Sequence, residues 1–325
     1  MRPGLLTFSL VILVGGSAAT AQPVTTQQSA PTSQGAVDKT TQTEDVRFRN
    51  DLYDRMTVPV RLSGTGPYRF LVDTGADRTA ISRELAAKLK LAAGQKASLH
   101  SVSEKSTVAT ATVPDLQLTR RNVRVIDAPL LESVNMGADG ILGVDSLRYQ
   151  RVLFDFEGQR MSVVPSKIRE IANEPGAIVI TAKSRKGRLI ITEAKANGRR
   201  VTVVLDTGAQ VSIGNSALRK QLLGKGVSDG PKQIELHSVT GGKIMGDYLF
   251  VREVEMGGVE LSNLAIVFAD AHTFKALGLD RKPALLLGMN ALRAFKKVSI
   301  DFANKTFRVV VPERSENEMK LAERL

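Results

Sequence analysis

Short runs of alternating apolar and polar residues dominate the chain from residue 46 onwards. Residues 57–62 and 188–192 are examples, and their period of two is that of a half-buried β-strand. Two apolar stretches with helical spacing, residues 82–91 and 215–223, each begin at a good N-cap residue and predict short helices. The pattern therefore predicts an all-β protein with a few short helices.

A tetrapeptide, Asp-Thr-Gly-Ala, occurs twice, beginning at Asp73 and at Asp206, and each copy follows an apolar strand. Three further landmarks repeat in the same order. They are Leu-His-Ser-Val at 99–102 and 236–239, an apolar pair with glycine at 141–143 and 286–288, and alternating hairpin segments at 152–165 and 298–312. Such a series predicts a duplicated domain rather than a duplicated motif.

The repeat divides the folded chain into two lobes, residues 46–172 and 173–312. The offset between the copies grows from 133 positions, between residues 73 and 206, to 145 positions, between residues 143 and 288. We therefore expect an insertion in the second lobe, near residues 278–283. Residues 313–325 form a polar tail.

The N-terminal residues have the features of an export signal. Arg2 precedes an apolar stretch at 5–14, and small residues end at Ala21, so we expect a signal peptide over residues 1–21, cleaved after Ala21. A retained N-terminal anchor is the alternative; after removal no integral membrane segment is expected. Residues 22–45, rich in Thr, Gln, Ser and Pro, predict a disordered linker. The expected localisation is periplasmic or secreted.

The composition narrows the choice of partners. The chain has 325 residues with 42% hydrophobic and 24% charged residues, which is typical of a globular protein with real cores. Its net charge of +12 would suit an anionic partner, but the basic residues are scattered, which favours a solvated surface over nucleic-acid binding. With no Cys, and three His without ligand spacing, we expect no metal and no cofactor.

The two aspartates are candidates for acid–base chemistry. Each lies where a buried strand ends in a glycine turn, and a pseudo-twofold axis would bring Asp73 and Asp206 face to face. Two carboxylates so close share one proton. The ionised member can then act as a general base on water, while the protonated member donates to the carbonyl under attack.

The segments around Asp73 and Asp206, with the later Leu-Gly elements, resemble those of retropepsin-type aspartic proteases, over about residues 46–312. The resemblance implies two pseudo-twofold-related β-barrel lobes in one chain, as in pepsin-like enzymes, so that a monomer forms the site alone. It implies a catalytic dyad, supporting turn residues, flap hairpins at 100–106 and 237–243, and substrate-binding positions. These residues are Asp73 and Asp206 for the dyad; Thr74, Gly75, Thr207 and Gly208 for its support; and Ala76, Ala209, Gly241 and Gly242 for substrate.

The chain departs from the family pattern at three points. Ala76 and Ala209 replace the hydroxyl residue of pepsin-like enzymes, which predicts a working pH nearer neutral. The arginine that would pair with Asp77 is replaced by Val144, so the partner of Asp77 is unknown. The first flap lacks the glycines of the second, which predicts one working flap.

The expected function is an aspartic endopeptidase that hydrolyses peptide bonds of exported or envelope polypeptides. Two alternatives remain: a catalytically silent peptide-binding module of the same fold, and an envelope-docking protein that uses its basic surface.

Overall fold

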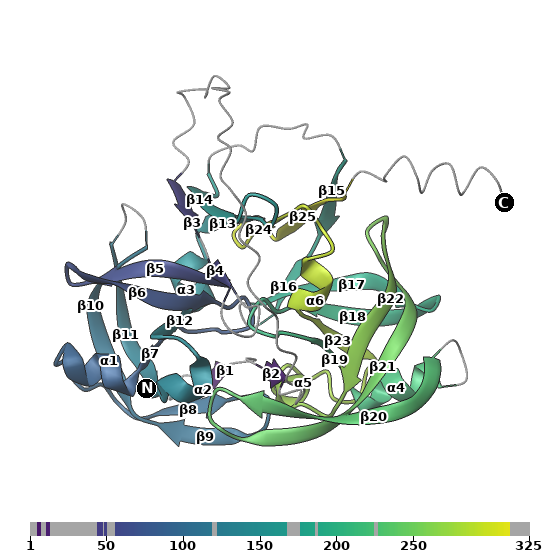
Figure 1. The fold of residues 1–325 in the computed structure, drawn as a ribbon, viewed down its shortest axis with the longest axis horizontal. Coiled ribbons are helices and arrows are strands. Elements are labelled where there is room, and N and C mark those ends of the chain that lie inside the picture. The colour runs from purple at the N-terminus through teal and green to yellow at the C-terminus, as the bar shows by residue number, and fades with distance from the viewer. Residues whose placement is uncertain are drawn as a thin grey trace, which may run out of the picture.

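The computed structural model describes residues 5–7, 11–13, 44–47, 49–50, 56–118, 122–167, 176–185, 188–223 and 227–312. In this part of the chain strands predominate and six short helices occur, so the predicted fold class is confirmed. Figure 1 shows two sheet-rich lobes, joined at one end by a sheet to which both contribute. The predicted polar tail lies outside the described residues.

The first lobe is a seven-stranded sheet in the order β10-β11-β7-β12-β6-β5-β4, and an extra pairing of β10 with β5 closes it on itself. Closure removes exposed edges and encloses a core of alternating inward residues. Its strands are β4 (Arg49–Asn50), β5 (Met56–Leu62), β6 (Thr65–Val72), β7 (Ala80–Ser82), β10 (Thr110–Gln117), β11 (Asn122–Leu131) and β12 (Gly140–Leu142).

The second lobe repeats this plan with longer strands, in the order β16-β17-β18-β23-β19-β22-β21-β20-β2, closed by a pairing of β17 with β21. Its own strands are β16 (Lys183–Arg185), β17 (Arg188–Ala196), β18 (Arg199–Leu205), β19 (Ser212–Gly214), β20 (Val227–Ser238), β21 (Lys243–Met256), β22 (Val259–Phe268) and β23 (Ala284–Leu287). In both lobes one strand, β12 or β23, inserts parallel to the strand that precedes Asp73 or Asp206. The duplication is thus visible in the topology.

Two hairpins project from the lobes and face each other. The first is β8 (Ala97–His100) with β9 (Lys105–Val108), and the second is the end of β20 with the start of β21. We call them the first and second flap. Two strands from the N-terminal residues add to them: β1 (Leu5–Thr7) lies parallel to β8, and β2 (Val11–Leu13) lies antiparallel to β20. In Figure 1 both lie between the lobes, beside the flap strands.

The predicted terminal hairpins are present, and the structure joins them into one interlobe sheet, in the order β15-β25-β24-β13-β14-β3. These strands are β3 (Glu44–Arg47), β13 (Gln150–Asp155), β14 (Arg160–Pro165), β15 (Ala177–Thr181), β24 (Lys297–Asp301) and β25 (Thr306–Val310). The lobes meet where β13 pairs with β24, with Val152 opposite Ile300 and Phe154 opposite Val298. All four side chains are buried, so the two lobes share one apolar core here.

The two predicted helices are present but shorter. The first, α1 (Arg83–Lys88), is capped by the Ser82 hydroxyl and ends where Lys90 takes a left-handed conformation, φ 50°. The second, α4 (Ser216–Leu222), is capped by the Asn215 side chain. The other helices are α2 (Ser133–Met136), α3 (Val144–Leu147), α5 (His272–Ala276) and α6 (Met289–Leu292). No helix among the described residues is long and apolar enough to cross a membrane.

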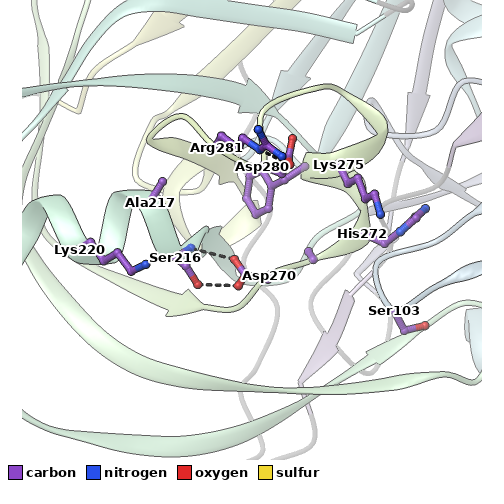
Figure 2. A pocket seen from close by; sticks show the side chains of 11 residues that line it. Ser103, Ser216, Ala217, Lys220, Asp270, His272, Lys275, Asp280 and Arg281 are labelled. Atoms are coloured by element: carbon purple, nitrogen blue, oxygen red, sulfur yellow. Dashed lines mark hydrogen bonds and ion pairs between the residues drawn. The ribbon is translucent and has the colours of Figure 1, made fainter.

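A cavity of about 670 Å³ lies in the second lobe between α4 and α5, and Figure 2 shows the first-flap residue Ser103 and His272 at one end of it. Eight of its eleven lining residues are polar or charged. The lining side chains are Ser103, Ser216, Ala217, Lys220, Asp270, Ala271, His272, Phe274, Lys275, Asp280 and Arg281. The connection from β22 to β23, which contains α5 and residues 277–283, has 15 residues, whereas that from β11 to β12 has 8, so the extra residues of the second lobe lie here, as the sequence predicts.

The shared core makes a stability prediction. Replacing Phe154, which is buried in the interlobe sheet, by Ala should cost about 3–5 kcal/mol of unfolding free energy because a large cavity is left. Urea denaturation of the purified protein measures this cost. Tyr149→Ala is the matched control, since Tyr149 precedes the same hairpin but is 67% exposed, and its loss should cost less than about 1 kcal/mol. Equal costs for the two variants would contradict a core shared across this sheet.

Candidate active site

Both Asp-Thr-Gly turns are held from behind by the inserted strands. The backbone N–H of Asp73 donates to the carbonyl of Leu142 at 3.0 Å, and that of Asp206 donates to Leu287 at 3.1 Å. Strands β6 and β18 end in fully buried apolar residues, so each turn emerges directly from a core. Each aspartate is therefore fixed by strands on both sides of its turn rather than carried on a free loop.

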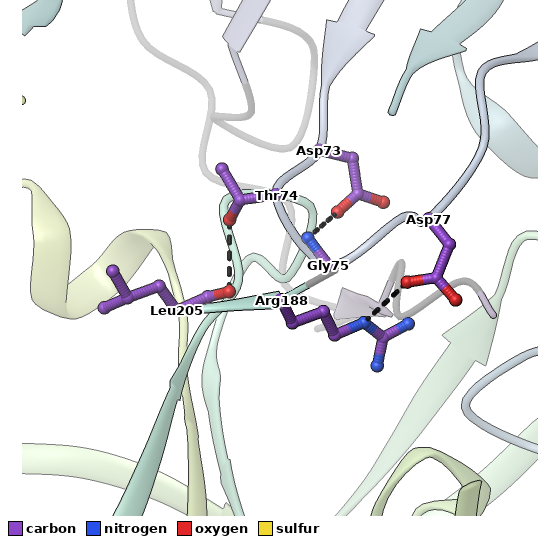
Figure 3. Close-up of polar contacts among 6 residues, drawn as sticks. All are labelled: Asp73, Thr74, Gly75, Asp77, Arg188 and Leu205. Carbon is purple, nitrogen blue, oxygen red and sulfur yellow. Dashed lines mark hydrogen bonds and ion pairs between the residues drawn. The ribbon is translucent and has the colours of Figure 1, made fainter. Parts of the chain in front are cut away.

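Two threonines join the turns to each other. The backbone N–H of Thr74 donates to Thr207 Oγ1 at 3.0 Å, and the reverse bond, from Thr207 N–H to Thr74 Oγ1, is also 3.0 Å. Each hydroxyl then donates across the interface, Thr207 to the Val72 carbonyl at 2.7 Å and Thr74 to the Leu205 carbonyl at 3.1 Å. Figure 3 shows the bond from Thr74 to Leu205. These reciprocal bonds are those that the family resemblance implies.

The two carboxylates lie across from one another, each against the glycine of the other turn. A Cβ atom on Gly75 would lie 2.5 Å from Asp206 Oδ1, and one on Gly208 would overlap the Asp73 carboxylate. Gly75 N–H donates to Asp73 Oδ1 at 2.7 Å, while Asp206 Oδ1 accepts from Gly208 at 3.1 Å and from Ala209 at 3.2 Å. Only glycine fits at residues 75 and 208, since any side chain would displace the facing aspartate.

The environment favours one proton on this pair. Both aspartates are fully buried. Burial, followed by the charge of Asp73, raises the pKa of Asp206 well above its ordinary value. The Arg188 guanidinium and the amides of Gly208 and Ala209 act in the opposite direction. The pair can thus hold one proton at a pH where an exposed aspartate is ionised.

Arg188 is a residue that the sequence reading missed, and it supplies the unknown partner of Asp77. Its side chain is fully buried at the start of β17, and its Nε lies 3.5 Å from Asp77 Oδ1 (Figure 3). The ion pair crosses from the second lobe to the turn of the first. Gln210 stands at the position equivalent to Asp77 in the second lobe, so the pair has no symmetric counterpart there. The sequence feature that could have indicated this partner is an arginine at the start of an apolar strand, 18 positions before Asp206.

Comparison with known families supports both lobes. Residues 58–149 match the gag-polyprotein aspartyl protease family, and residues 192–291 match the aspartyl protease family. The chain belongs to the retropepsin-like aspartic proteases. No curated protein matches the sequence. One retropepsin-like domain thus lies in each lobe, and the resemblance seen in the sequence is confirmed.

Residues just after the Leu-Gly elements hydrogen-bond the segments that follow the two Asp-Thr-Gly turns. Asp145 Oδ1 accepts from the N–H and the hydroxyl of Thr79, at 2.8 and 2.7 Å. Asn290 Oδ1 accepts the same two bonds from Ser212, at 2.9 and 2.8 Å. One lobe thus uses a carboxyl where the other uses an amide. Burial raises the pKa of Asp145, although the bonds from Thr79 oppose this shift.

The candidate substrate-binding residues fall into two groups. Ala76 and Ala209 are fully buried, and their carbonyls accept from Val144 N–H at 2.9 Å and Met289 N–H at 2.8 Å. They pack the turns onto the Leu-Gly elements, and the proposal that their backbone also meets a substrate stays a prediction.

The candidate glycines of the second flap lie at its tip. Gly241 has a left-handed φ of 84°, and a Cβ on it would lie 3.1 Å from Asn135 Nδ2 of α2. Gly242 lies against Ser103 of the first flap. The Thr240 hydroxyl also donates to Ser101 Oγ at 3.2 Å, so the two flap tips touch. Both hairpins are formed, and the expectation of one working flap is untested by this arrangement.

The Asp145–Asn290 difference generates a prediction about stability and pH. The pKa of Asp145 is higher in the folded protein than in the unfolded chain, so the unfolded chain releases this proton more readily. The unfolding free energy of the wild type therefore falls as the pH rises from about 4, the ordinary aspartate pKa, through the raised pKa of Asp145. Asp145→Asn removes this loss, so we expect it to stabilise the protein at pH 7 by on the order of 1 kcal/mol, with less effect at pH 4. Urea midpoints at both pH values measure the gain.

The reciprocal swap is the matched control. Asn290→Asp places a carboxylate where Asn290 Nδ2 now donates to the Ala265 carbonyl at 2.8 Å, so it should destabilise the protein at pH 7. Destabilisation by Asp145→Asn at pH 7 would show that Asp145 is needed as a charge.

Proposed function

We propose that this protein is an aspartic endopeptidase with Asp73 and Asp206 as its catalytic dyad. The observation that carries the proposal is the placement of two buried carboxylates, one from each retropepsin-like domain, against each other's glycine turn. The raised pKa of Asp206 supports it, since a shared proton is what the chemistry needs. One chain supplies both halves, so a monomer is sufficient.

The proposed reaction is direct attack by water on a peptide carbonyl. The ionised carboxylate takes a proton from the water, whose oxygen bonds to the carbonyl carbon, while the protonated carboxyl donates to the carbonyl oxygen. The tetrahedral intermediate then collapses: one of its hydroxyl groups returns a proton to the ionised carboxylate, the C–N bond breaks, and the leaving nitrogen takes a proton from the dyad. The products are a carboxylic acid and an amine, which become a carboxylate and an ammonium group in water. The dyad returns to its state with one proton.

The strand pairing of the flaps supports an extended polypeptide as the substrate. Because the lobes are related by a pseudo-twofold axis, one straight segment crossing both flaps must run parallel to one flap strand and antiparallel to the other. Strands β1 and β2 of the chain do this, with Leu6 opposite Leu99 in parallel and Ile12 opposite His237 in antiparallel pairing. Main-chain hydrogen bonding of this kind accepts many sequences.

The cellular setting is a further part of the proposal. The signal-like features of residues 1–21, with small residues before Gln22, support export, and we propose exported or envelope proteins as substrates.

Variants of the dyad test the proposal. Asp73→Asn and Asp206→Asn should each lower kcat/KM on a denatured protein substrate by a factor on the order of 10⁴, because neither can share a proton as a carboxyl pair does. Asp155→Asn is the matched control, since Asp155 lies in the interlobe hairpin, and it should keep its activity. If wild type binds the substrate without cutting it between about pH 3 and pH 8, the protein is a binding module instead.

Removal of Arg188 should move the pH profile. The guanidinium lowers the pKa of Asp206, so in Arg188→Met the dyad keeps its shared proton to higher pH. The pH at which kcat/KM falls on the alkaline side of the profile should therefore shift upwards, by up to about one pH unit. Lys195→Met, which removes an exposed cation from the same strand, should leave the profile in place. Identical profiles for wild type and Arg188→Met would mean that the arginine only ties the lobes together.

A further inference from the structure

The first flap is docked on the opposite lobe at its tip. The backbone N–H of His272, at the start of α5, donates to the Val102 carbonyl at 2.7 Å. The ring of His272 lies against that of His100, which ends β8, with Nε2 2.7 Å from His100 Nδ1. The ring centroids are 4.8 Å apart, and the planes differ by 21°. Val102 and His100 are buried, at 1% and 7% exposure, so the contact is packed as well as hydrogen-bonded.

We infer that His272 is a positioning residue, which together with His100 latches the first flap onto the second lobe, and that the latch releases when the imidazole pair takes up two protons. Its role is distinct from that of the dyad, since the ring of His272 lies against His100 of the first flap and its N–H binds the flap backbone at Val102. The consequence for substrate entry rests on the proposed function, whereas the latch itself does not.

The release follows from the chemistry of imidazole. A neutral ring has one N–H donor and one acceptor nitrogen, so two neutral rings can form one N–H···N bond. A single added proton can be shared on that bond. A second proton leaves both nitrogens as donors, and two cations then face each other at hydrogen-bonding distance in a partly buried site. The doubly protonated pair must separate.

The charges around the pair are more basic than acidic. Burial, followed by the charges of Lys275 and Lys105, lowers the pKa of His272. Three acidic and two further basic side chains lie on the flap or line the neighbouring cavity: Glu104, Asp270, Asp280, Lys220 and Arg281. Two of the acids are engaged, because Asp270 accepts from Ser216 and Asp280 lies 3.9 Å from Arg281.

The direction of the pH effect follows from these shifts. In the open flap the rings are exposed and have the ordinary histidine pKa of about 6.5. In the closed flap the pKa of His272 is lowered, so protons bind the open form preferentially. The closed form is therefore favoured above about pH 6.5 and loses stability as the pH falls below that value.

The second flap provides an internal control, because its equivalent histidine has a different partner. His237 Nε2 lies 2.6 Å from Glu235 Oε1, within the same flap, and Lys243 Nζ lies 2.9 Å from the same oxygen. Across the lobes, the tip of this flap meets no imidazole: Gly241 lies against Asn135, and Gly242 lies against Ser103 and Glu104 of the first flap. Of the two equivalent histidines, only His100 faces a second imidazole.

A distance measurement across the first flap tests the latch. The chain has no cysteine, so Thr107→Cys on β9 and Arg281→Cys on the second lobe give two clean sites for nitroxide labels. Both positions are exposed. Double electron–electron resonance on the full chain should give one narrow distance distribution at about pH 7.5. At about pH 4.5 it should become longer and broader.

Two variants decide whether the pair is responsible. His272→Gln keeps the backbone bond to Val102 and can still hydrogen-bond His100, but it cannot form a double cation, so its distribution should be the same at both pH values. His237→Gln should respond to pH as the wild type does. A wild-type distribution that does not change with pH overturns the proposal, and so does a His272→Gln response equal to that of the wild type.

A second measurement covers the case in which His272→Gln does not fold. The protein has three histidines, so ¹⁵N-histidine labelling of the otherwise unaltered chain gives three ring systems to follow by NMR. His100→Gln and His237→Gln assign them. The proposal requires the His100 and His272 rings to titrate together and His237 to titrate independently, and independent titration of all three overturns it. Neither measurement needs activity, so failure of the latch is distinguishable from failure of the dyad.

Discussion

The reciprocal bonds between Thr74 and Thr207 are the constraint on which the rest of the site depends. Each threonine uses its hydroxyl both as acceptor from the facing amide and as donor to a carbonyl behind that amide. Neither turn can shift without breaking bonds in both lobes, and the bonds are buried, so water cannot replace them at low cost. These hydrogen bonds also place the two carboxylates opposite each other, since each aspartate is the residue immediately before its threonine.

Duplication within one chain allows the halves to differ, and several equivalent positions do. Asp77 pairs with Arg188 across the lobes, while Gln210 stands at the equivalent position. Asp145 and Asn290 accept the same hydrogen bonds with different chemistry. A homodimer must place the same residue on both sides of its axis, whereas this chain can give its two carboxylates different surroundings. Arg188, which pairs with Asp77 of the first lobe, is one of the groups that lower the pKa of Asp206.

Much of the architecture could be predicted from the sequence because it is encoded locally. The alternation in strands, the caps at Ser82 and Asn215, and the repeated glycine turns each act over a few residues, and all were found where expected. The joining of β13 to β24, the Arg188–Asp77 pair and the His100–His272 contact were not predicted. Each joins residues more than one hundred positions apart, and neither partner has a pattern of its own that points to the other.

The interlobe sheet has a consequence for the order of events during synthesis. Val152 of the first lobe pairs with Ile300, so the strand that completes this part of the first lobe's core is among the last described segments to be made. Contacts of such long sequence separation form slowly, because a long loop must be closed before they contribute. The first lobe therefore reaches its full packing only after β24 of the second lobe has been made, and Asp73 and Asp206 can face each other only once both lobes have folded. A chain that stops before residue 297 lacks β24, so Val152 and Phe154 of the first lobe would have no partner strand on that side.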